Sequence, residues 1–174
     1  MTSILKVTEI QDPTNGNTAL TIDSTGRISM PSRPVFKAHN GSSYTRNFSG
    51  SETLIDFDTV NIDVGSNYDN ATGQSNFTAP VDGIYFFTTS VRMDGIASSV
   101  GYAYIRFYKN GSALTGGTAL DITSGFGSTY HTFIMSDIFE LTANDYIDIR
   151  CYVPGDSSVT VYDEQSIFAG YLLA

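Results

Sequence analysis

Residues 57–87 read FDTVNIDVGSNYDNATGQSNFTAPVDGIYFF, and they carry the most informative pattern in this chain. Aromatic side chains recur there at fixed intervals, together with one acidic residue and one glycine. In chain order these positions are Phe57, Asp63, Tyr68, Phe77, Gly83, Tyr85 and Phe87. The whole chain is rich in residues typical of pleated sheets and tight turns, with 11 Tyr, 11 Phe and 16 Gly. The composition therefore predicts an all-β chain.

Short runs of alternating apolar and polar residues, separated by turn clusters, continue from residue 35 to the end of the chain. Such spacing is typical of a β-sandwich or β-barrel. The pair Asn110-Gly111 predicts a tight hairpin turn, because both residues tolerate positive φ angles. Residues 141–145 predict a second turn between two long strands. The segments predicted as strands are residues 53–57, 84–92, 102–109, 130–140, 146–151, 159–162 and 166–172.

The end of the chain completes a family motif. Residues 166–173 read SIFAGYLL, which places Phe168 and Gly170 in a closing apolar strand. Together with the spacing within residues 57–87, this ending resembles the C1q/TNF-like domain. That family has Phe, Asn or Asp, an aromatic residue, a second Phe and a G-x-Y-x-F run in this order. The resemblance covers residues 35–174 and implies a jelly-roll sandwich that forms a homotrimer, with the signature positions in its core.

Two positions depart from the family pattern. Eight residues separate Tyr68 from Phe77, where the family usually has six, and Thr89 stands where a further aromatic residue is expected. Residues 69–73 read DNATG, a turn sequence that can absorb an insertion. The expected fold is therefore unchanged.

The charge of the chain restricts its partners. The 174 residues have a formal net charge of −9, and because residues 1–34 are neutral the excess negative charge lies in residues 35–174. An acidic surface repels phosphate backbones and anionic membranes, so nucleic acid is excluded as a direct partner. The sequence also lacks an apolar stretch long enough to span a bilayer, so membrane insertion is not expected.

The first residues and the cysteine count predict a compartment. Residues 1–7 lack a charged segment followed by a long apolar run, so we expect no signal peptide and assembly in a cytoplasm. The single cysteine, Cys151, rules out an intrachain disulfide. No G-X-Y repeat is present, so the collagen stalk of many animal C1q relatives is not expected.

Residues 1–34 are predicted to form a short β-rich stalk, and residues 35–174 the jelly-roll head. Residues 19–22 and 27–30 alternate around a turn that contains Gly26, which predicts a β-hairpin. An isolated two-stranded hairpin is only marginally stable in water, so its apolar side chains need a cover. Copies from neighbouring chains would supply it. The predicted trimer contacts of the stalk are Leu20, Ile22, Ile28 and Met30.

Residues 17–28, NTALTIDSTGRI, are similar to segments that precede C1q-like heads in tail-fibre and other virion proteins of bacteriophages, especially those of marine cyanobacteria. The resemblance implies a virion protein whose N-terminal segment attaches to other virion proteins. The favoured function is a trimeric tail-fibre or spike tip that binds a host-surface receptor, a glycan or a protein. Two alternatives remain at this point. One is a capsid-decoration or head-fibre protein without receptor binding, and the other is a glycan depolymerase.

No standard catalytic motif is present, so we expect no enzyme and no cofactor. Alternation in residues 146–151 predicts a buried Cys151. Neither histidine belongs to a metal or triad pattern. His131 shares a predicted strand face with Phe133 and Met135, and a packed or interface role is expected for it and for His39.

Three carboxylates keep two other chemistries open. Asp56 and Asp58 are two residues apart in a predicted strand and could share a face, as a glycosidase pair requires. The same pair with Asp63 could hold calcium, which prefers oxygen ligands and which some C1q-like trimers bind near their axis. The solvated, edge-protecting charge is the favoured interpretation.

Tyrosines on one predicted strand have two interpretations as well. Tyr102, Tyr104 and Tyr108 alternate with apolar residues, so both faces of the strand are expected to be covered. Packing between subunits is favoured over a sugar-stacking platform. Receptor contacts are expected in loops far from the stalk, such as residues 95–101 or 116–128.

Overall fold

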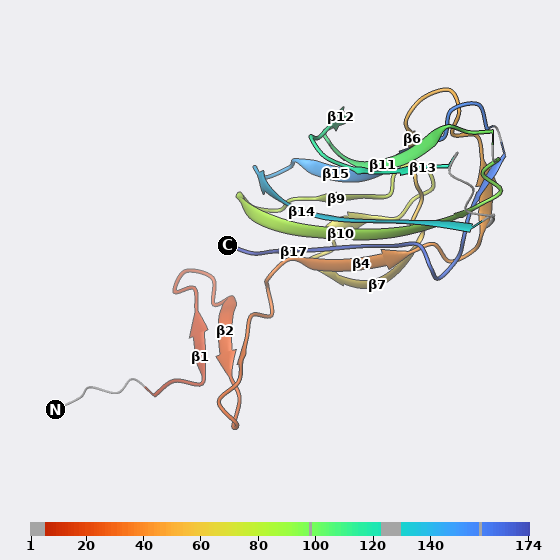
Figure 1. Ribbon diagram of the computed structural model, residues 1–174. Helices are drawn as coiled ribbons and strands as arrows, with labels where there is room; N and C mark the ends of the chain where they lie inside the picture. Colours follow the sequence, from red (N-terminus) through yellow and green to blue (C-terminus); the bar gives the residue numbers. More distant parts are fainter. Residues whose placement is uncertain (1–5, 98, 123–129, 157) are drawn as a thin grey trace.

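The computed structural model describes residues 6–97, 99–122, 130–156 and 158–174, and these contain strands but no helix (Figure 1). Two sheets of seven strands each pack face to face, and a third sheet of three strands stands apart near the N-terminus. The all-β prediction is therefore confirmed. Among the described residues, none belongs to a helix that is long and apolar enough to cross a membrane.

The first large sheet is called the β10 sheet here, and its strand order is β5-β16-β10-β17-β4-β7, with β14 paired to β10. All of its pairings are antiparallel. The longest pairing joins β10 to β14 over their full lengths, from Gly83 opposite Leu141 to Asp94 opposite Tyr130. The strands are β4 Val35–His39, β5 Tyr44–Arg46, β7 Thr59–Val64, β10 Gly83–Asp94, β14 Tyr130–Leu141, β16 Val159–Val161 and β17 Ile167–Leu172.

The second large sheet, the β11 sheet, has the order β12-β11-β15-β9-β8, with β13 paired to β11 and β6 paired to β15. Its pairings are antiparallel too. The strands are β6 Thr53–Leu54, β8 Tyr68–Asp69, β9 Asn76–Thr78, β11 Tyr102–Lys109, β12 Ser112–Ala113, β13 Thr118–Asp121 and β15 Tyr146–Tyr152.

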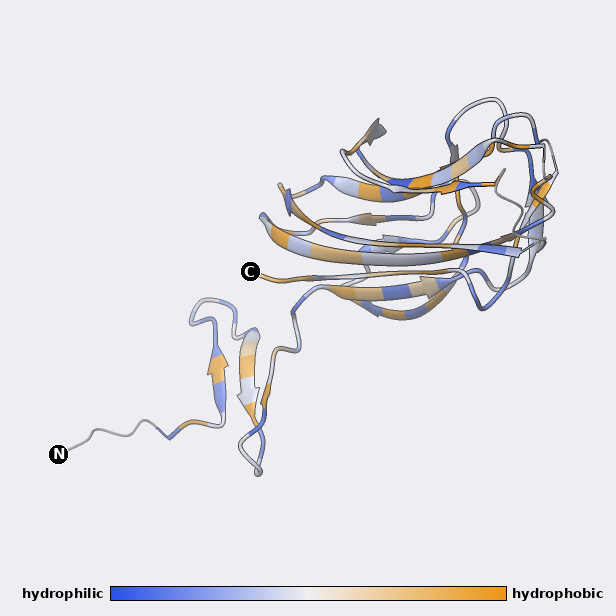
Figure 2. Cartoon of the chain, viewed as in Figure 1, coloured by the Kyte–Doolittle hydropathy of each residue, from blue (hydrophilic) through white to orange (hydrophobic). Residues whose placement is uncertain are grey.

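Strict alternation of buried and solvent-facing side chains builds the core between the two sheets. Along β10, the side chains of every second residue from Tyr85 to Met93 are buried, and Figure 2 shows apolar and polar segments alternating on this strand. Aromatic rings fill the centre. Phe36 stacks on Phe77 with ring centroids 4.8 Å apart and meets Phe168 edge-on at the same distance. The fully buried aromatic residues are Phe36, Phe48, Phe57, Phe77, Tyr85, Phe87, Phe133 and Phe168.

Six of the seven predicted strands are confirmed, with ends that differ by at most two residues. The seventh, residues 53–57, is too long, because β6 ends at Leu54. The Ile55 N–H still donates to the Ile149 carbonyl of β15 at 2.9 Å, but the next two backbone N–H groups do not continue the ladder. The N–H of Asp56 donates to the Tyr44 hydroxyl, and that of Phe57 donates to the Ser75 hydroxyl. Side chains from distant segments satisfy this backbone and end the strand.

Both predicted turns of the head are confirmed. Asn110 and Gly111 have φ angles of 51° and 76° and join β11 to β12, as a type I′ hairpin requires. Residues 142–145 turn the chain from β14 into β15, and the Asp145 carboxylate accepts the N–H of Thr142 within that turn. This second turn connects the β10 sheet to the β11 sheet.

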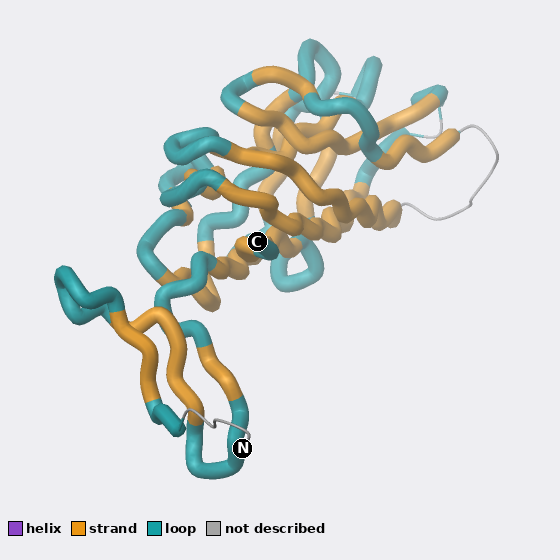
Figure 3. The backbone as a smooth tube through the Cα atoms, turned by 90° about the vertical axis from the view of Figure 1, so that its left-hand side faces the viewer, coloured by secondary structure: helices purple, strands orange, loops and turns teal. Residues whose placement is uncertain are grey.

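The N-terminal sheet consists of β1 Glu9–Gln11, β2 Thr18–Ile22 and β3 Ile28–Ser29, and β1 was not predicted. Gly26 has a φ of 81°, so the predicted turn between β2 and β3 is confirmed. Figures 1 and 3 show this sheet projecting from one end of the sandwich, beside the C-terminus. We call it the stalk sheet.

Candidate assembly and binding surfaces

The residues that carry the family resemblance lie in the core and in turns. Gly83 and Gly170 allow close approaches. A Cβ at Gly170 would lie 2.5 Å from a ring carbon of Phe87 and 2.9 Å from the Phe86 carbonyl oxygen. Asp63 closes a turn, because its carboxylate accepts the N–H groups of Asn67 and Tyr68 at 2.9 and 3.2 Å. The signature aromatic residues, all buried, are Phe57, Tyr68, Phe77, Tyr85, Phe87 and Phe168.

The two departures from the family pattern fit the structure. Thr89 is buried, and its hydroxyl donates to the carbonyl of Ile167 at 2.8 Å, so a polar residue replaces the aromatic one with its hydrogen bond satisfied. The extra residues between Tyr68 and Phe77 lie in the turn between β8 and β9, where Gly73 has a φ of 80°.

The three candidate carboxylates do not converge. Asp56 forms an ion pair with Arg46 and accepts the N–H of Gly73 at 3.0 Å, whereas Asp58 accepts the N–H of Gly41 at 2.7 Å. Both lie between β6 and β7, so the expectation that they share a strand face is wrong. Within the described residues, no group of three His, Cys, Asp or Glu side chains is placed to hold a metal ion. Each carboxylate stabilises a different turn.

His131 lies buried on the same strand face as Phe133 and Met135, as predicted. The Nδ1 atom of the other histidine, His39, is 2.9 Å from the Asn61 Oδ1. Cys151 is fully buried against Met93, with the two sulfur atoms 3.6 Å apart. Burial raises the pKa of the Cys151 thiol, which makes it unreactive at neutral pH.

An apolar row crosses the solvent-facing side of the β10 sheet. Register places Ile138 opposite Phe86, Phe86 opposite Tyr171, Tyr171 opposite Val35, and Val35 opposite Val64. Residues directly opposite each other in a sheet share a face, so five apolar side chains from five strands stand in line. Ile138 is 54% exposed and Tyr171 39%. We call these five residues the apolar row.

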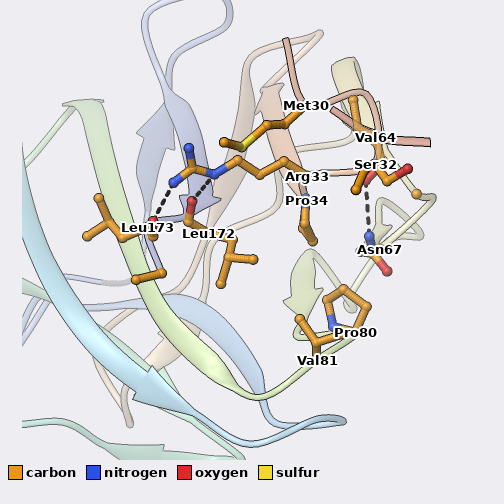
Figure 4. Close-up of a pocket in the computed structure, with 13 residues that line it drawn as sticks. Met30, Ser32, Arg33, Pro34, Val64, Asn67, Pro80, Val81, Leu172 and Leu173 are labelled. Atoms are coloured by element: carbon orange, nitrogen blue, oxygen red, sulfur yellow. Dashed lines mark hydrogen bonds between the residues drawn. The ribbon is translucent and has the colours of Figure 1, made fainter. Parts of the chain in front are cut away.

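The apolar row continues toward the stalk sheet. Val35 and Val64 line a hollow together with Ile28 and Met30. A neighbouring cavity of about 530 Å³ lies between the stalk sheet and the sandwich (Figure 4). There the Arg33 guanidinium donates to the carbonyl oxygens of residues 172 and 173, which ties the linker to the end of β17.

Three of the four predicted stalk contacts, Leu20, Ile22 and Ile28, share one face of the stalk sheet. Leu20 stands opposite Ile10 and Ile22 opposite Ile28, and positions 20 and 22 are on the same side of β2. Leu20 and Ile22 are half-buried, whereas Ile28 is 62% exposed and Met30 50%. One face of the stalk sheet is therefore apolar and largely open to solvent in the single chain.

The solvent-facing side of the β11 sheet has a different chemistry. Tyr102 and Tyr104 stack with parallel rings 6.1 Å apart, and Tyr152 on β15 packs 5.5 Å from Tyr104. The Arg106 guanidinium lies 4.5 Å from the Tyr104 ring centroid, and that of Arg150 lies 4.4 Å from the ring of Tyr108. We call residues Tyr102, Tyr104, Arg106, Arg150 and Tyr152 the Tyr–Arg ladder. Tyr102 is 48% exposed, so this face of the strand is not covered within the single chain, and its expected packing between subunits stays a prediction.

The electrostatics of the ladder are locally balanced. Glu52 lies 3.4 Å from Arg106, and Arg150 binds Asp148 through two hydrogen bonds of 2.9 and 3.2 Å. Burial, reinforced by a hydrogen bond to Glu52, raises the pKa of Tyr104 to about 12. The phenol therefore stays protonated at physiological pH and can donate a hydrogen bond.

The predicted receptor loops are described in part. Residues 95–101 connect β10 to β11 at the end of the head opposite the stalk sheet (Figure 1), and the Ala97 N–H donates to Asp156 at 2.8 Å. Residue 98 lies outside the described residues. Of the loop at residues 116–128, positions 123–128 also lie outside them.

The comparisons agree with this geometry. Residues 36–173 match the family model of the C1q domain, and the chain therefore belongs to the C1q domain family. The globular domain of zebrafish complement 1qA is 14% identical with a TM-score of 0.56, over 81% of this chain and 98% of that one. Murine APRIL is 11% identical with a TM-score of 0.54, over 81% of this chain and 99% of that one. Eiger TNF from S. frugiperda is 12% identical with a TM-score of 0.52, over 82% of this chain and 94% of that one.

At these identities the solved structures establish the C1q/TNF jelly-roll fold alone. A comparison of the sequence with curated proteins finds no match. Domains of this family typically form homotrimers and bind ligands, and they are generally not enzymes.

Proposed function

We propose that this chain forms a homotrimer in which the apolar row and the apolar face of the stalk sheet are buried against neighbouring copies. The observation that carries the proposal is the apolar row itself. Five side chains from five strands form one continuous strip, and its three central members, Phe86, Tyr171 and Val35, carry no charge. Interface cores are depleted of charge and enriched in aromatic residues, as this strip is.

The stalk sheet supports the same assembly independently. A three-stranded sheet with an open apolar face gains stability only when another surface covers it. Ile28 and Met30 line the hollow that the apolar row reaches through Val35 and Val64. One assembly event would therefore bury the stalk face and the row together.

In function, we propose a bacteriophage virion protein, a tail-fibre or spike tip that attaches to a host-surface glycan or protein. The resemblance of residues 17–28 to virion proteins and the family's binding role support this proposal. Three identical sites on one rigid trimer gain roughly 10²–10⁴ in avidity when all of them engage a cell surface. The depolymerase alternative loses support, because the carboxylate of Asp56 is engaged by Arg46.

The experiment has two readouts on the full chain. Light scattering should give a mass three times the 18.8 kDa of one chain. The labelled protein, added to a panel of marine cyanobacterial strains, should coat susceptible cells and block their infection. A mass of 18.8 kDa at micromolar concentration would contradict the trimer. Failure to coat any strain, with tight binding to phage capsids, would replace the attachment role with capsid decoration.

A further inference from the structure

The Tyr–Arg ladder continues into a polar pocket on the same sheet. Arg150 belongs to both, because it pairs with Asp148 at the wall of this pocket. The pocket has a volume of about 590 Å³. Amide, carboxylate, phenol and guanidinium groups line it, from Asp69, Gln74, Asn76, Tyr146, Asp148 and Arg150.

Register shows that the ladder and the pocket form one surface. Tyr104 stands opposite Tyr152, Arg106 opposite Arg150, and Tyr108 opposite Asp148. The six residue steps from Tyr102 to Tyr108 span roughly 20 Å. One end of the surface therefore offers stacked aromatic rings and the other offers a hollow with hydrogen-bonding groups.

This combination fits a sugar chain better than it fits an apolar or a strongly charged ligand. Tyr102, which is 48% exposed, offers rigid aromatic area to the C–H groups of a pyranose ring, and Tyr104, which lies between Tyr102 and the Arg106 guanidinium, supports it from behind. Pocket amides such as Gln74 can hydrogen-bond the hydroxyls of the sugar. The ladder and the pocket contain two carboxylates, Asp69 and Asp148, and two guanidinium groups, Arg106 and Arg150. Glu52, which pairs with Arg106 at the edge of the ladder, adds a third carboxylate. In a chain of net charge −9, this balance disfavours an anionic sugar.

The location of the surface keeps it accessible in the proposed assembly. The ladder lies on the β11 sheet, whereas the apolar row lies on the outer side of the β10 sheet, and the shared core separates them. A trimer that buries the row therefore leaves one ladder open on each subunit.

We infer that the Tyr–Arg ladder and its adjoining pocket bind a neutral oligosaccharide, with the tyrosines stacking on sugar rings and the pocket fixing hydroxyl groups. The inference rests on the proposed receptor-binding function and names its site and ligand class. It moves the ligand contacts from the distal loops to the flat face of the β11 sheet.

The test uses the full-length protein on an array that carries neutral hexose oligosaccharides beside uronic-acid and sialylated ones. The double variant Tyr102→Ala/Tyr152→Ala and the pocket variant Gln74→Ala should each weaken binding to the neutral probes by about tenfold or more. The matched control is Tyr162→Ala. The Arg92 guanidinium lies 4.6 Å from the centroid of the Tyr162 ring, so this tyrosine makes the same kind of contact as the ladder tyrosines. Tyr162 lies beside the β10 sheet, however, so removal of its ring should leave binding unchanged.

The outcomes separate this inference from the function on which it rests. Host-cell binding that survives in the double variant would overturn the site while the attachment role stands. Binding of wild-type protein to acidic probes alone would overturn the ligand class only. Wild-type protein that binds neither cells nor any probe would overturn the attachment role and the inference together.

Discussion

The two outer faces of this sandwich are built by the same alternation but differ in chemistry. The β10 sheet presents an apolar row in which Ile138 is 54% exposed. The β11 sheet presents tyrosines and arginines whose charges are paired with carboxylates such as Glu52 and Asp148. An uncharged apolar strip gains from removal from water, whereas paired charges and phenols lose hydration when they are covered. The difference is what we would expect if, as proposed, one face serves assembly and the other recognition.

The largest effect is expected in the core that lies between the two sheets. Phe168 contacts Phe36 and Phe87 within the β10 sheet and Phe107 of the β11 sheet, at centroid distances of 4.8, 6.0 and 6.4 Å. Phe168→Ala should lower the free energy of unfolding by about 3–5 kcal/mol, because it leaves a cavity in a close-packed core. Urea unfolding measures this loss, and Phe168→Leu should cost less. A loss below about 1 kcal/mol would contradict a single shared core.

The second-largest effect should distinguish the apolar row from the Tyr–Arg ladder. Ile138→Asp places a charge in the apolar row, and an unpaired charge buried at an interface costs roughly 3–5 kcal/mol. Light scattering should show the mass falling from three times 18.8 kDa to 18.8 kDa. Tyr102→Asp is the matched control, because it adds the same charge to an exposed position on the other sheet, and it should leave the mass unchanged. Equal dissociation by both variants would remove the distinction between the faces.

A pH effect should appear at the turn that joins the two sheets. Hydrogen bonds from Lys109, from the Thr142 N–H and from Asn110 lower the pKa of Asp145 from 3.8 to about 2. A lowered pKa in the folded state contributes stability above pH 4, and this stability is lost as the pH falls from about 4 to about 2. Asp145→Asn should therefore be less stable than the wild type at pH 7, with a smaller difference near pH 2.5. A difference that is independent of pH in urea unfolding would contradict this assignment.

The smallest effect concerns the ladder itself. Tyr102 is 48% exposed and loses its ring contacts with Tyr104 and Tyr152 when it is truncated. Tyr102→Ala should change the free energy of unfolding by less than about 1 kcal/mol in thermal or urea denaturation. A larger loss would show that the ladder supports the fold, and the contrast between an assembly face and a recognition face would weaken.

Particular residues show which parts of the structure could be predicted from the sequence. The Asn110-Gly111 turn, the burial of Cys151 and the course of β11 were predicted, because each depends on a local rule about φ angles or alternation. The strand predicted at residues 53–57 failed at Asp56, since its N–H is satisfied by Tyr44 from another part of the chain. The predicted loop contacts stay a prediction, and the sheet face that we infer instead could not be found from the sequence, because the exposure of Tyr102 depends on what covers the sheet.

The amino-acid order alone determined the all-β class, the family and the inward-facing side chains, because aromatic spacing and a two-residue period are local properties of the chain. Only the tertiary structure decided which outward-facing side chains become neighbours. The apolar row takes residues 35, 64, 86, 138 and 171 from five strands. The ladder joins β11 to β15, which are neighbours in the sheet although β12, β13 and β14 lie between them along the chain. Strand pairing at such separations is set by the register of the whole sheet, which no short stretch of sequence contains.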